Sequence, residues 1–373
     1  MAFQWKDRKD IWKGEGVYHL TFAVAGRQPL LGRLVALTDV TRPDENTNER
    51  KYTTKLATVR LSPLGYEISR DLREFQKRHP NILVCGKQIM ETHLHVVLWV
   101  QEDNGRSILE VAKGFLQGIT KIARDLGVWP PEGCVTEGRE LQSLVDKKGA
   151  CNAPIVPYHV LEKPYIRTLS RQGQLEAMIN YVHANPDNAW MRRLNPDLYF
   201  IRRRQEHAGL IFDTMGKARL LDYPDRQVIA LSRSLTPEQI EAEVQKALRK
   251  AERGVVTYTA AINAGEKAVS RAVREAGFPL VVMMLGGFPP EGSEAARYFH
   301  PSGVYHKACG EGLLYLMAPH ADNYNNPRLI DLTETELTRK AEAKGFCYTP
   351  LPRTTTRWRM IAGNVMLKMI AGD

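Results

Sequence analysis

The chain has 373 residues, a net charge of +10 at pH 7 and 25% charged residues, which is the composition of a water-soluble globular protein long enough for two domains. No apolar run approaches the roughly 20 residues needed to cross a membrane, and the polar residues 1–10 are unlike a secretory signal. The five cysteines lack C-x-x-C spacing, which argues against a disulfide framework or a structural zinc site and favours a reducing cytoplasm.

The residues before position 127 predict a sheet with two helices. Alternating or continuous apolar residues predict strands over 17–24, 82–90 and 91–100. Helical spacing predicts a helix that begins at Ser62-Pro63 and ends near His79-Pro80, and a second that runs from Ile108 to Gly127. Polar residues 40–52 are expected to form a loop. The order strand, helix, strand, strand, helix is that of an α+β ferredoxin-like sheet.

The strand over 91–100 carries the first candidate site. Because successive side chains of a strand alternate between its faces, His93 and His95 lie on one face with Val97 and Trp99, and the intervening apolar residues lie on the other. Two adjacent imidazoles can share one divalent metal. The alternative is a pair of histidines on a solvated face.

Residues 127–157 interrupt the periodic pattern. Prolines and glycines punctuate this polar stretch, which therefore predicts an inserted loop. Two residues just downstream, His159 and Tyr165, are reserve candidates for chemistry.

A helix over residues 172–186 carries the second candidate site. Leu175, Met178, Ile179 and Val182 form its apolar stripe, and Tyr181 and Asn185 lie one turn apart on a neighbouring face. A purely structural interpretation is also open, in which Tyr181 flanks the core and Asn185-Pro186 ends the helix.

A basic cluster follows this helix. Residues 191–204 contain five arginines and one aspartate, interleaved with Tyr199 and Phe200, and the arginines are Arg192, Arg193, Arg202, Arg203 and Arg204. Arginine and aromatic side chains suit phosphate contacts and stacking on unpaired bases. The alternative is a solvated basic face.

From residue 227 onward, strands alternate with helices. Apolar strands are predicted at 228–231, 255–258, 279–285 and 312–317, with helices opening at Thr236, over 266–276, over 333–344 and over 356–370. This alternation predicts a Rossmann-like α/β domain with a parallel sheet. The N–H groups that open the helix near Glu266 could hold a phosphate, although the nearby glycines are as well explained by turns. Neither G-x-G-x-x-G nor G-K-[ST] is present, which argues against a dinucleotide or P-loop site.

The ordered combination of His93-Leu94-His95 on a strand and Tyr181-x-x-x-Asn185-Pro186 on a later helix resembles the HUH single-tyrosine transposases, and among them the REP-associated tyrosine transposases. The resemblance extends to residues 16–22, which look like the family's opening strand, and to residues 174–178 ahead of the tyrosine. It covers residues 14–212 and implies an HUH domain, which we place at 1–226, followed by the Rossmann-like domain at 227–373. The second domain is faintly similar to that of DNA-processing proteins.

The resemblance also implies a chemistry. His93, His95 and Asn185 would hold Mg²⁺ or Mn²⁺, and Tyr181 would attack single-stranded DNA, keep the 5′ phosphate and release a 3′ hydroxyl. Because the phosphotyrosine conserves the energy of the broken bond, rejoining needs no ATP. The family also implies recognition of a hairpin, which the arginine cluster would grip. The family often has Met-Pro-Asn before the first histidine, whereas this chain has Met90-Glu91-Thr92, so Glu91 either adds a carboxylate near the cation or faces solvent.

Three functions are therefore open. The leading hypothesis is a metal-dependent DNA strand transferase, which is a transposase or its domesticated relative. We expect it to be a monomer or a homodimer and to have no membrane partner. The alternative is a non-catalytic nucleic-acid-binding module, with the C-terminal domain carrying the activity. A third hypothesis, an RNA-binding protein on a ferredoxin-like sheet, is weakened because the sequence has no RNP-type aromatic motif.

Overall fold

The computed structural model describes residues 15–37, 56–102, 105–138, 142, 153–297, 299, 301, 303–343 and 345–372. The chain forms two compact units, Met1–Trp190 and Met191–Asp373, each with its own hydrophobic core. Within the described residues, no helix combines the length and the apolar character needed to cross a membrane. The predicted loop at 40–52 and the polar residues 1–10 lie outside the described residues.

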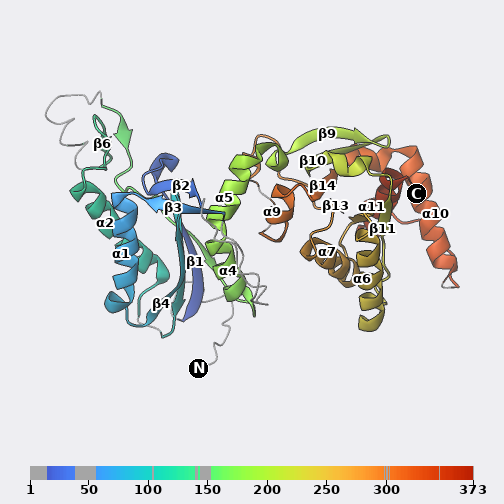
Figure 1. Cartoon of the computed structure of the whole chain (residues 1–373), viewed down its shortest axis with the longest axis horizontal. Coiled ribbons are helices and arrows are strands. Elements are labelled where there is room, and N and C mark those ends of the chain that lie inside the picture. Colours follow the sequence, from blue (N-terminus) through green and yellow to red (C-terminus); the bar gives the residue numbers. More distant parts are fainter. Residues whose placement is uncertain are drawn as a thin grey trace, which may run out of the picture. The chain divides into compact units, whose positions relative to one another are not determined.

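A four-stranded antiparallel sheet organises the first unit (Figure 1). Its strands are β1 (Gly16–Ala23), β4 (Ile82–Ile89), β5 (His93–Val100) and β8 (Tyr165–Thr168), in the spatial order β4-β5-β1-β8. Helices α1 (Pro63–Arg78) and α2 (Ile108–Asp125) cover one face of this sheet. The predicted order strand, helix, strand, strand, helix is confirmed.

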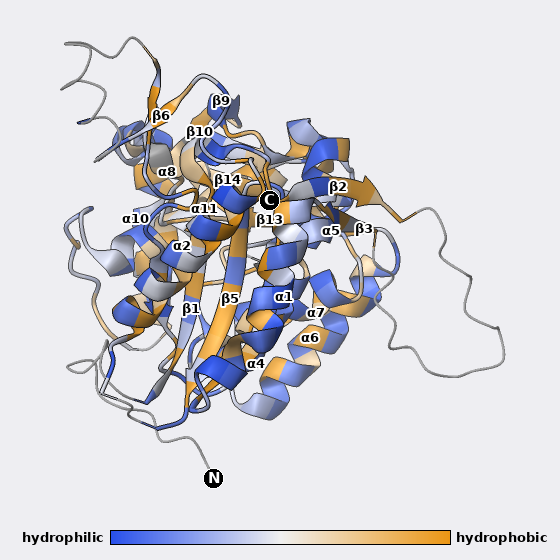
Figure 2. Ribbon diagram, turned by 90° about the vertical axis from the view of Figure 1, so that its left-hand side faces the viewer, coloured by the Kyte–Doolittle hydropathy of each residue, from blue (hydrophilic) through white to orange (hydrophobic). Residues whose placement is uncertain are grey.

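Local sequence signals explain where both helices begin. The side chain of Ser62 accepts a hydrogen bond from the N–H of Gly65, and Pro63 occupies the first helical position. Ser107 and Glu110 form a reciprocal capping box at the start of α2. In Figure 2, β1 and β5 are largely hydrophobic, whereas α1 and α4 alternate hydrophilic and hydrophobic residues, as expected for helices with one buried face.

The opposite face of the sheet is covered by helix α4 (Gln174–His183). Leu175, Met178 and Val182 of this helix pack against Val17 of β1 and Val97 of β5. A single turn at Ala184 separates α4 from α5 (Asn185–Leu194). The predicted continuous helix over 172–186 is therefore two helices, and Asn185 begins the second.

Three short strand pairs in the first unit were not predicted from the sequence. A hairpin joins β2 (Gly32–Ala36) to β3 (Ala57–Leu61), and β8 extends the main sheet. The segment 127–157 is not only a loop, because β6 (Val135–Thr136) pairs in parallel with β7 (Ile155–Val156) and Trp129 is buried in the core. Two-residue and edge strands lack the long apolar alternation on which sequence prediction depends.

The second unit is built on a six-stranded mixed sheet in the order β11-β12-β13-β14-β10-β9. The four strands β11 (Arg226–Ile229), β12 (Val256–Thr259), β13 (Leu280–Met283) and β14 (Leu314–Pro319) are parallel, as predicted. Strands β9 (Arg202–His207) and β10 (Leu210–Gly216) form an antiparallel hairpin that pairs with β14.

Helices cover both faces of this second sheet. Helices α6 (Pro237–Ala251), α7 (Ala264–Glu275) and α9 (Gly303–Gly310) pack on one face, and α10 (Pro327–Glu342) and α11 (Thr356–Ala371) pack on the other. The described residues also include short helical segments: η2 (Ala25–Arg27), η3 (Pro196–Tyr199), η4 (Ala218–Asp222), α8 (Glu294–Arg297) and η5 (Ala321–Asn325). The helix predicted over 333–344 begins earlier, at Pro327, where Asn326 caps its first turn.

The division between the units differs from the predicted boundary after residue 226. Residues 191–226 belong to the second unit because the β9–β10 hairpin is part of its sheet. The partner strand β14 lies about a hundred positions further along the chain, so no local pattern could reveal this pairing.

Candidate functional site

The two histidines of β5 lie on the sheet face that α4 covers. Their rings are 5.0 Å apart between centroids and nearly perpendicular, and His95 is only 5% exposed. The alternate residues of β5, including Leu94 and Val96, pack into the core on the opposite face. The predicted division of side chains between the two faces is confirmed.

A third histidine, which the sequence did not single out, completes the cluster. His19 of β1 places its Nε2 3.0 Å from Nδ1 of His95, and the two rings stack with centroids 5.1 Å apart. The hydroxyl of Thr21 is also 3.0 Å from Nδ1 of His95, because Thr21 is directly opposite His95 in the β1–β5 register. The alternation of residues 16–23 could have shown which face of the strand His19 occupies. It could not have shown that β5, 74 to 76 positions further along the chain, is the neighbouring strand.

Burial keeps both rings of the His19–His95 pair neutral at pH 7. Loss of solvation, followed by the nearby charges of His93, His19 and Arg27, lowers the pKa of His95 to about 2. Loss of solvation, followed by the charge of Arg167, lowers the pKa of His19 to about 4. Neutral imidazole is the form that binds metals.

Tyr181 lies beside this histidine cluster. Its ring centroid is 5.9 Å from that of His95 and 6.4 Å from that of His19, in edge-to-face arrangements. Helix α4 carries the tyrosine there because its apolar stripe packs on the same face of the sheet. The fold therefore brings together His19, His95 and Tyr181, although Tyr181 is at least 86 positions away from each histidine in the sequence. The proximity of His95 and Tyr181 was predicted.

Asn185 is placed differently. Its side chain is 7% exposed, and its Nδ2 donates to the carbonyl oxygens of Tyr181 (3.1 Å) and Val182 (3.2 Å). These bonds tie the Asn185 side chain to the last turn of α4, where the carbonyl of Val182 also accepts from the backbone N–H of Ala184. Within the described part of the chain, no hydrogen bond or ring contact joins Asn185 to the histidines, so its role as a metal ligand stays a prediction.

Glu91 is half-buried and does not simply face solvent, and its expected role near a cation stays a prediction. One of its carboxylate oxygens accepts a hydrogen bond of 2.8 Å from the backbone N–H of Leu34, and its carbonyl accepts one from Leu31. The side chain thus anchors the β2–β3 hairpin to the turn that precedes β5.

The two reserve candidates lie on opposite sides of the sheet. Nδ1 of His159 is 3.0 Å from the hydroxyl of Thr120 on α2, which packs on the face away from the histidine cluster. Tyr165 is directly opposite Thr21 in the β1–β8 register and therefore shares the face of the cluster. Only Tyr165 remains a reserve candidate on this geometry.

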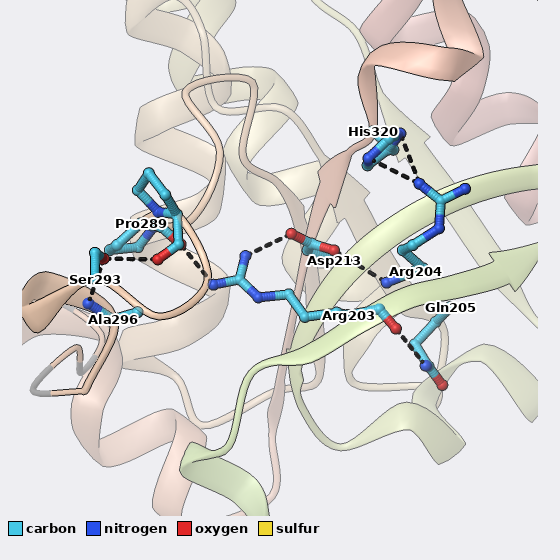
Figure 3. A network of polar contacts seen from close by, with 9 residues as sticks. Arg203, Arg204, Gln205, Asp213, Pro289, Ser293, Ala296 and His320 are labelled. Atoms are coloured by element: carbon cyan, nitrogen blue, oxygen red, sulfur yellow. Dashed lines mark hydrogen bonds and ion pairs between the residues drawn. The ribbon is translucent and has the colours of Figure 1, made fainter.

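The predicted arginine cluster lies in the second unit, where Arg203 and Arg204 make intramolecular contacts (Figure 3). Arg203 pairs with Asp213 (2.6 Å) and donates to the carbonyl of Pro289. Arg204 contacts His320, as Figure 3 also shows. It also pairs with Asp322 (3.2 Å). Nearby, Tyr199 is held by hydrogen bonds to His306, so its predicted base stacking is not supported, whereas Phe200 is exposed.

At the start of α7, where a phosphate site was predicted, the N–H of Glu266 donates to Oδ1 of the N-cap residue Asn263 (2.9 Å). The buried carboxylate of Glu266 accepts hydrogen bonds from the backbone N–H groups of Leu231 and Ile262 and from the side chain of Asn263. These contacts hold the Glu266 carboxylate against the segments that follow β11 and β12, and the phosphate site at the start of α7 stays a prediction.

The histidines of the first unit are chemically suited to a divalent metal, but they do not by themselves form a complete set of ligands. His93 and His95 present imidazoles on one face, and His95 is neutral with its Nδ1 already engaged, which leaves Nε2 as its ligand atom. Among the described residues, no group of three or more His, Cys, Asp or Glu side chains is arranged to hold a metal ion. An amide ligand such as Asn185 is not one of these four residue types, so it would add to the two histidines.

Comparison with known proteins adds no assignment. No protein-family model matches the chain, and no curated protein sequence is significantly similar to it.

Proposed function

We propose that the first unit cleaves and rejoins single-stranded DNA through a 5′-phosphotyrosine on Tyr181, in the manner of the HUH single-tyrosine transposases. The observation that carries the proposal is the position of the Tyr181 ring, 5.9 Å from the ring of His95 across two elements that meet only through folding. A structural tyrosine on this helix would not need to face a buried polar cluster.

The topology supports the same proposal. The spatial order β4-β5-β1-β8, all antiparallel with α1 and α2 on one face, is the order expected if the unit has the ferredoxin-like arrangement of HUH domains. We likewise infer that the second unit is Rossmann-like, because its four central strands are parallel and helices cover both faces.

In the proposed reaction, the phenolic oxygen of Tyr181 attacks the phosphorus in line with the departing 3′ oxygen. The phenol proton is released, the oxygen–phosphorus bond to tyrosine forms, and the bond to the 3′ oxygen breaks as that oxygen takes up a proton. Attack by a 3′ hydroxyl reverses the step and restores Tyr181. Mg²⁺ or Mn²⁺, held by His93, His95 and Asn185, would withdraw charge from a non-bridging phosphate oxygen.

The chain's own residues supply position rather than acid–base strength. The α4 helix holds the nucleophile over the sheet, and the low pKa of His95 keeps that ring unprotonated as a ligand. Single-stranded DNA fits because its backbone can bend into a shallow site and its bases are unpaired. Recognition of a hairpin, and a role in transposition, are part of the proposal that rests on the family resemblance.

The direct test is a covalent adduct. The full chain is incubated with a panel of labelled, hairpin-bearing single strands and Mg²⁺ or Mn²⁺, and denaturing gels are searched for a protein–DNA band. We expect an adduct that EDTA prevents and that Tyr181→Phe abolishes, while binding of the same strands is retained.

The matched control is Tyr165→Phe, which removes the hydroxyl of the other tyrosine on this face. Its adduct yield should equal that of the unchanged protein. An adduct that persists in Tyr181→Phe and disappears in Tyr165→Phe would transfer the nucleophile to Tyr165. If no strand of the panel forms an adduct, the non-catalytic DNA-binding module becomes the better explanation.

A further inference from the structure

The face of the first sheet that carries the histidine cluster has a covered part and an open part. Helix α4 packs mainly on β4 and β5, and its apolar residues also reach Val17 near the start of β1. At the other side is β8, the edge strand beyond β1. The cluster of His19, Thr21 and His95 lies between the two.

Strand β8 turns two exposed side chains toward this face. Tyr165 is directly opposite Thr21, and Arg167 is directly opposite His19, so both share the face of the cluster. The intervening Ile166 packs against the core on the other face. Tyr165 is 70% exposed and Arg167 is also exposed, although each adjoins a residue of the buried cluster.

The charge of Arg167 reaches the cluster. It contributes to the lowered pKa of His19, after the larger effect of burial. Within the part of the chain that the structure describes, no carboxylate forms an ion pair with Arg167. The guanidinium is therefore a positive charge beside the site that remains available to an anion.

We propose that Tyr165 and Arg167 form a platform for unpaired nucleotides next to the phosphodiester that Tyr181 attacks. Tyr165 stacks on a base, and Arg167 contacts a neighbouring phosphate. Two strand spacings separate β8 from β5, so the platform lies about 10 Å from His95. The identity of the ligand as single-stranded DNA rests on the proposed function.

Protection of a sheet edge does not account for both residues. A charged side chain on an edge strand discourages pairing with another chain, and Arg167 supplies that charge. A large aromatic ring that is mostly exposed adds nothing to that protection and leaves apolar surface in water. Proteins that bind single-stranded nucleic acid, in contrast, commonly combine aromatic rings that stack on bases with arginines that contact phosphates.

The test measures binding separately from chemistry. Fluorescence anisotropy with labelled single strands is performed in a Tyr181→Phe background, so that no covalent product forms. Tyr165→Ala should weaken binding about 5- to 150-fold, as loss of one base-stacking contact does. Tyr165→Trp should retain it. Arg167→Gln should make the dependence of log K on log salt shallower by about 0.7.

A matched control exists on the other side of the sheet. Tyr66 on α1 is 55% exposed, and the guanidinium of Arg73 lies 6.0 Å from its ring centroid. Tyr66 and Arg73 therefore form a similar exposed tyrosine–arginine pair on the helix that covers the opposite face of the sheet. Tyr66→Ala should leave binding unchanged. The platform is overturned if Tyr165→Ala binds as Tyr66→Ala does, or if the chain does not bind single strands at all.

The two proposals fail in distinguishable ways. Normal binding and normal adduct formation in a Tyr165→Ala protein that retains Tyr181 would remove the platform and leave the proposed function intact. Weakened binding in Tyr165→Ala, with no adduct from the unchanged protein, would support the platform and remove the phosphotyrosine chemistry.

Discussion

At the scale of single residues, the histidine cluster is organised around one nitrogen atom. Nδ1 of His95 has two neighbours at 3.0 Å, Nε2 of His19 and the hydroxyl of Thr21. If Nδ1 carries the proton and donates to these acceptors, Nε2 of His95 keeps its lone pair for a metal. Hydrogen bonds of this kind fix the tautomer and the orientation of metal-binding histidines. His19 is then a positioning residue, which acts through His95.

Replacing His19 should weaken metal binding without removing a ligand. For His19→Ala we expect about 10- to 100-fold lower affinity for Mn²⁺, measured by electron paramagnetic resonance, because the ring of His95 loses one of its two supports. In the metal-free protein, ¹⁵N chemical shifts should show a mixed tautomer at His95 in place of a single one.

The conservative variant His19→Gln separates positioning from packing. A glutamine amide can place an acceptor near the position of Nε2, so it should restore much of the affinity. Thermal unfolding of both variants shows whether the fold is retained. Equal Mn²⁺ affinity in His19→Ala and the unchanged protein would mean that His19 only fills space.

At the scale of elements, the β9–β10 hairpin shows why a basic sequence cluster need not be a binding surface. The strand register shifts between Phe212 and Thr214, so that Arg203 and Arg204 together face Asp213. Asp213 accepts a hydrogen bond from the Arg203 side chain and another from the backbone N–H of Arg204 (3.0 Å), whose φ of 51° is unusual for a residue other than glycine. The carboxylate therefore holds an irregular strand in place.

Removal of this carboxylate should destabilise the second unit. Asp213→Ala leaves the Arg203 guanidinium, only 20% exposed, without its ion pair, and we expect a loss of about 2–3 kcal/mol in the free energy of unfolding, below the range for fully buried pairs. Chemical denaturation measures the change. The matched control is Asp322→Ala, which breaks the Arg204 pair at 56% exposure on both sides and should cost less than about 1 kcal/mol. Similar losses in the two variants would contradict the structural role assigned to Asp213.

At the scale of the whole molecule, the sequence predicted those features that are encoded locally. Long apolar alternation located β1, β4, β5 and the four parallel strands, and caps such as Ser62 and Thr236 located helix starts. The proximity of Tyr181 to His95 was predicted from the combination of a His-x-His strand and a later helix with Tyr-x-x-x-Asn-Pro, and not from any local periodicity. What the sequence did not predict depends on distant partners: His19 beside His95, and the hairpin beside β14. A pattern of period two gives the face of a strand but not its neighbour.

The corrected division of the chain leads to a prediction about fragments. A fragment that ends at residue 226 would contain the β9–β10 hairpin without β14, and would expose Leu210, Phe212 and Met215, all of which are fully buried in the complete chain. A fragment that ends at residue 195 keeps α5, whose Ala189 and Trp190 pack in the first unit, and omits the hairpin. We expect the shorter fragment to elute from a size-exclusion column as one defined species and the longer one to aggregate, because an unpaired apolar strand is a template for association. If the 1–226 fragment is instead the better behaved of the two, with a sharper unfolding transition, the hairpin must be stabilised by the first unit, and the division after Trp190 would not describe how the chain folds.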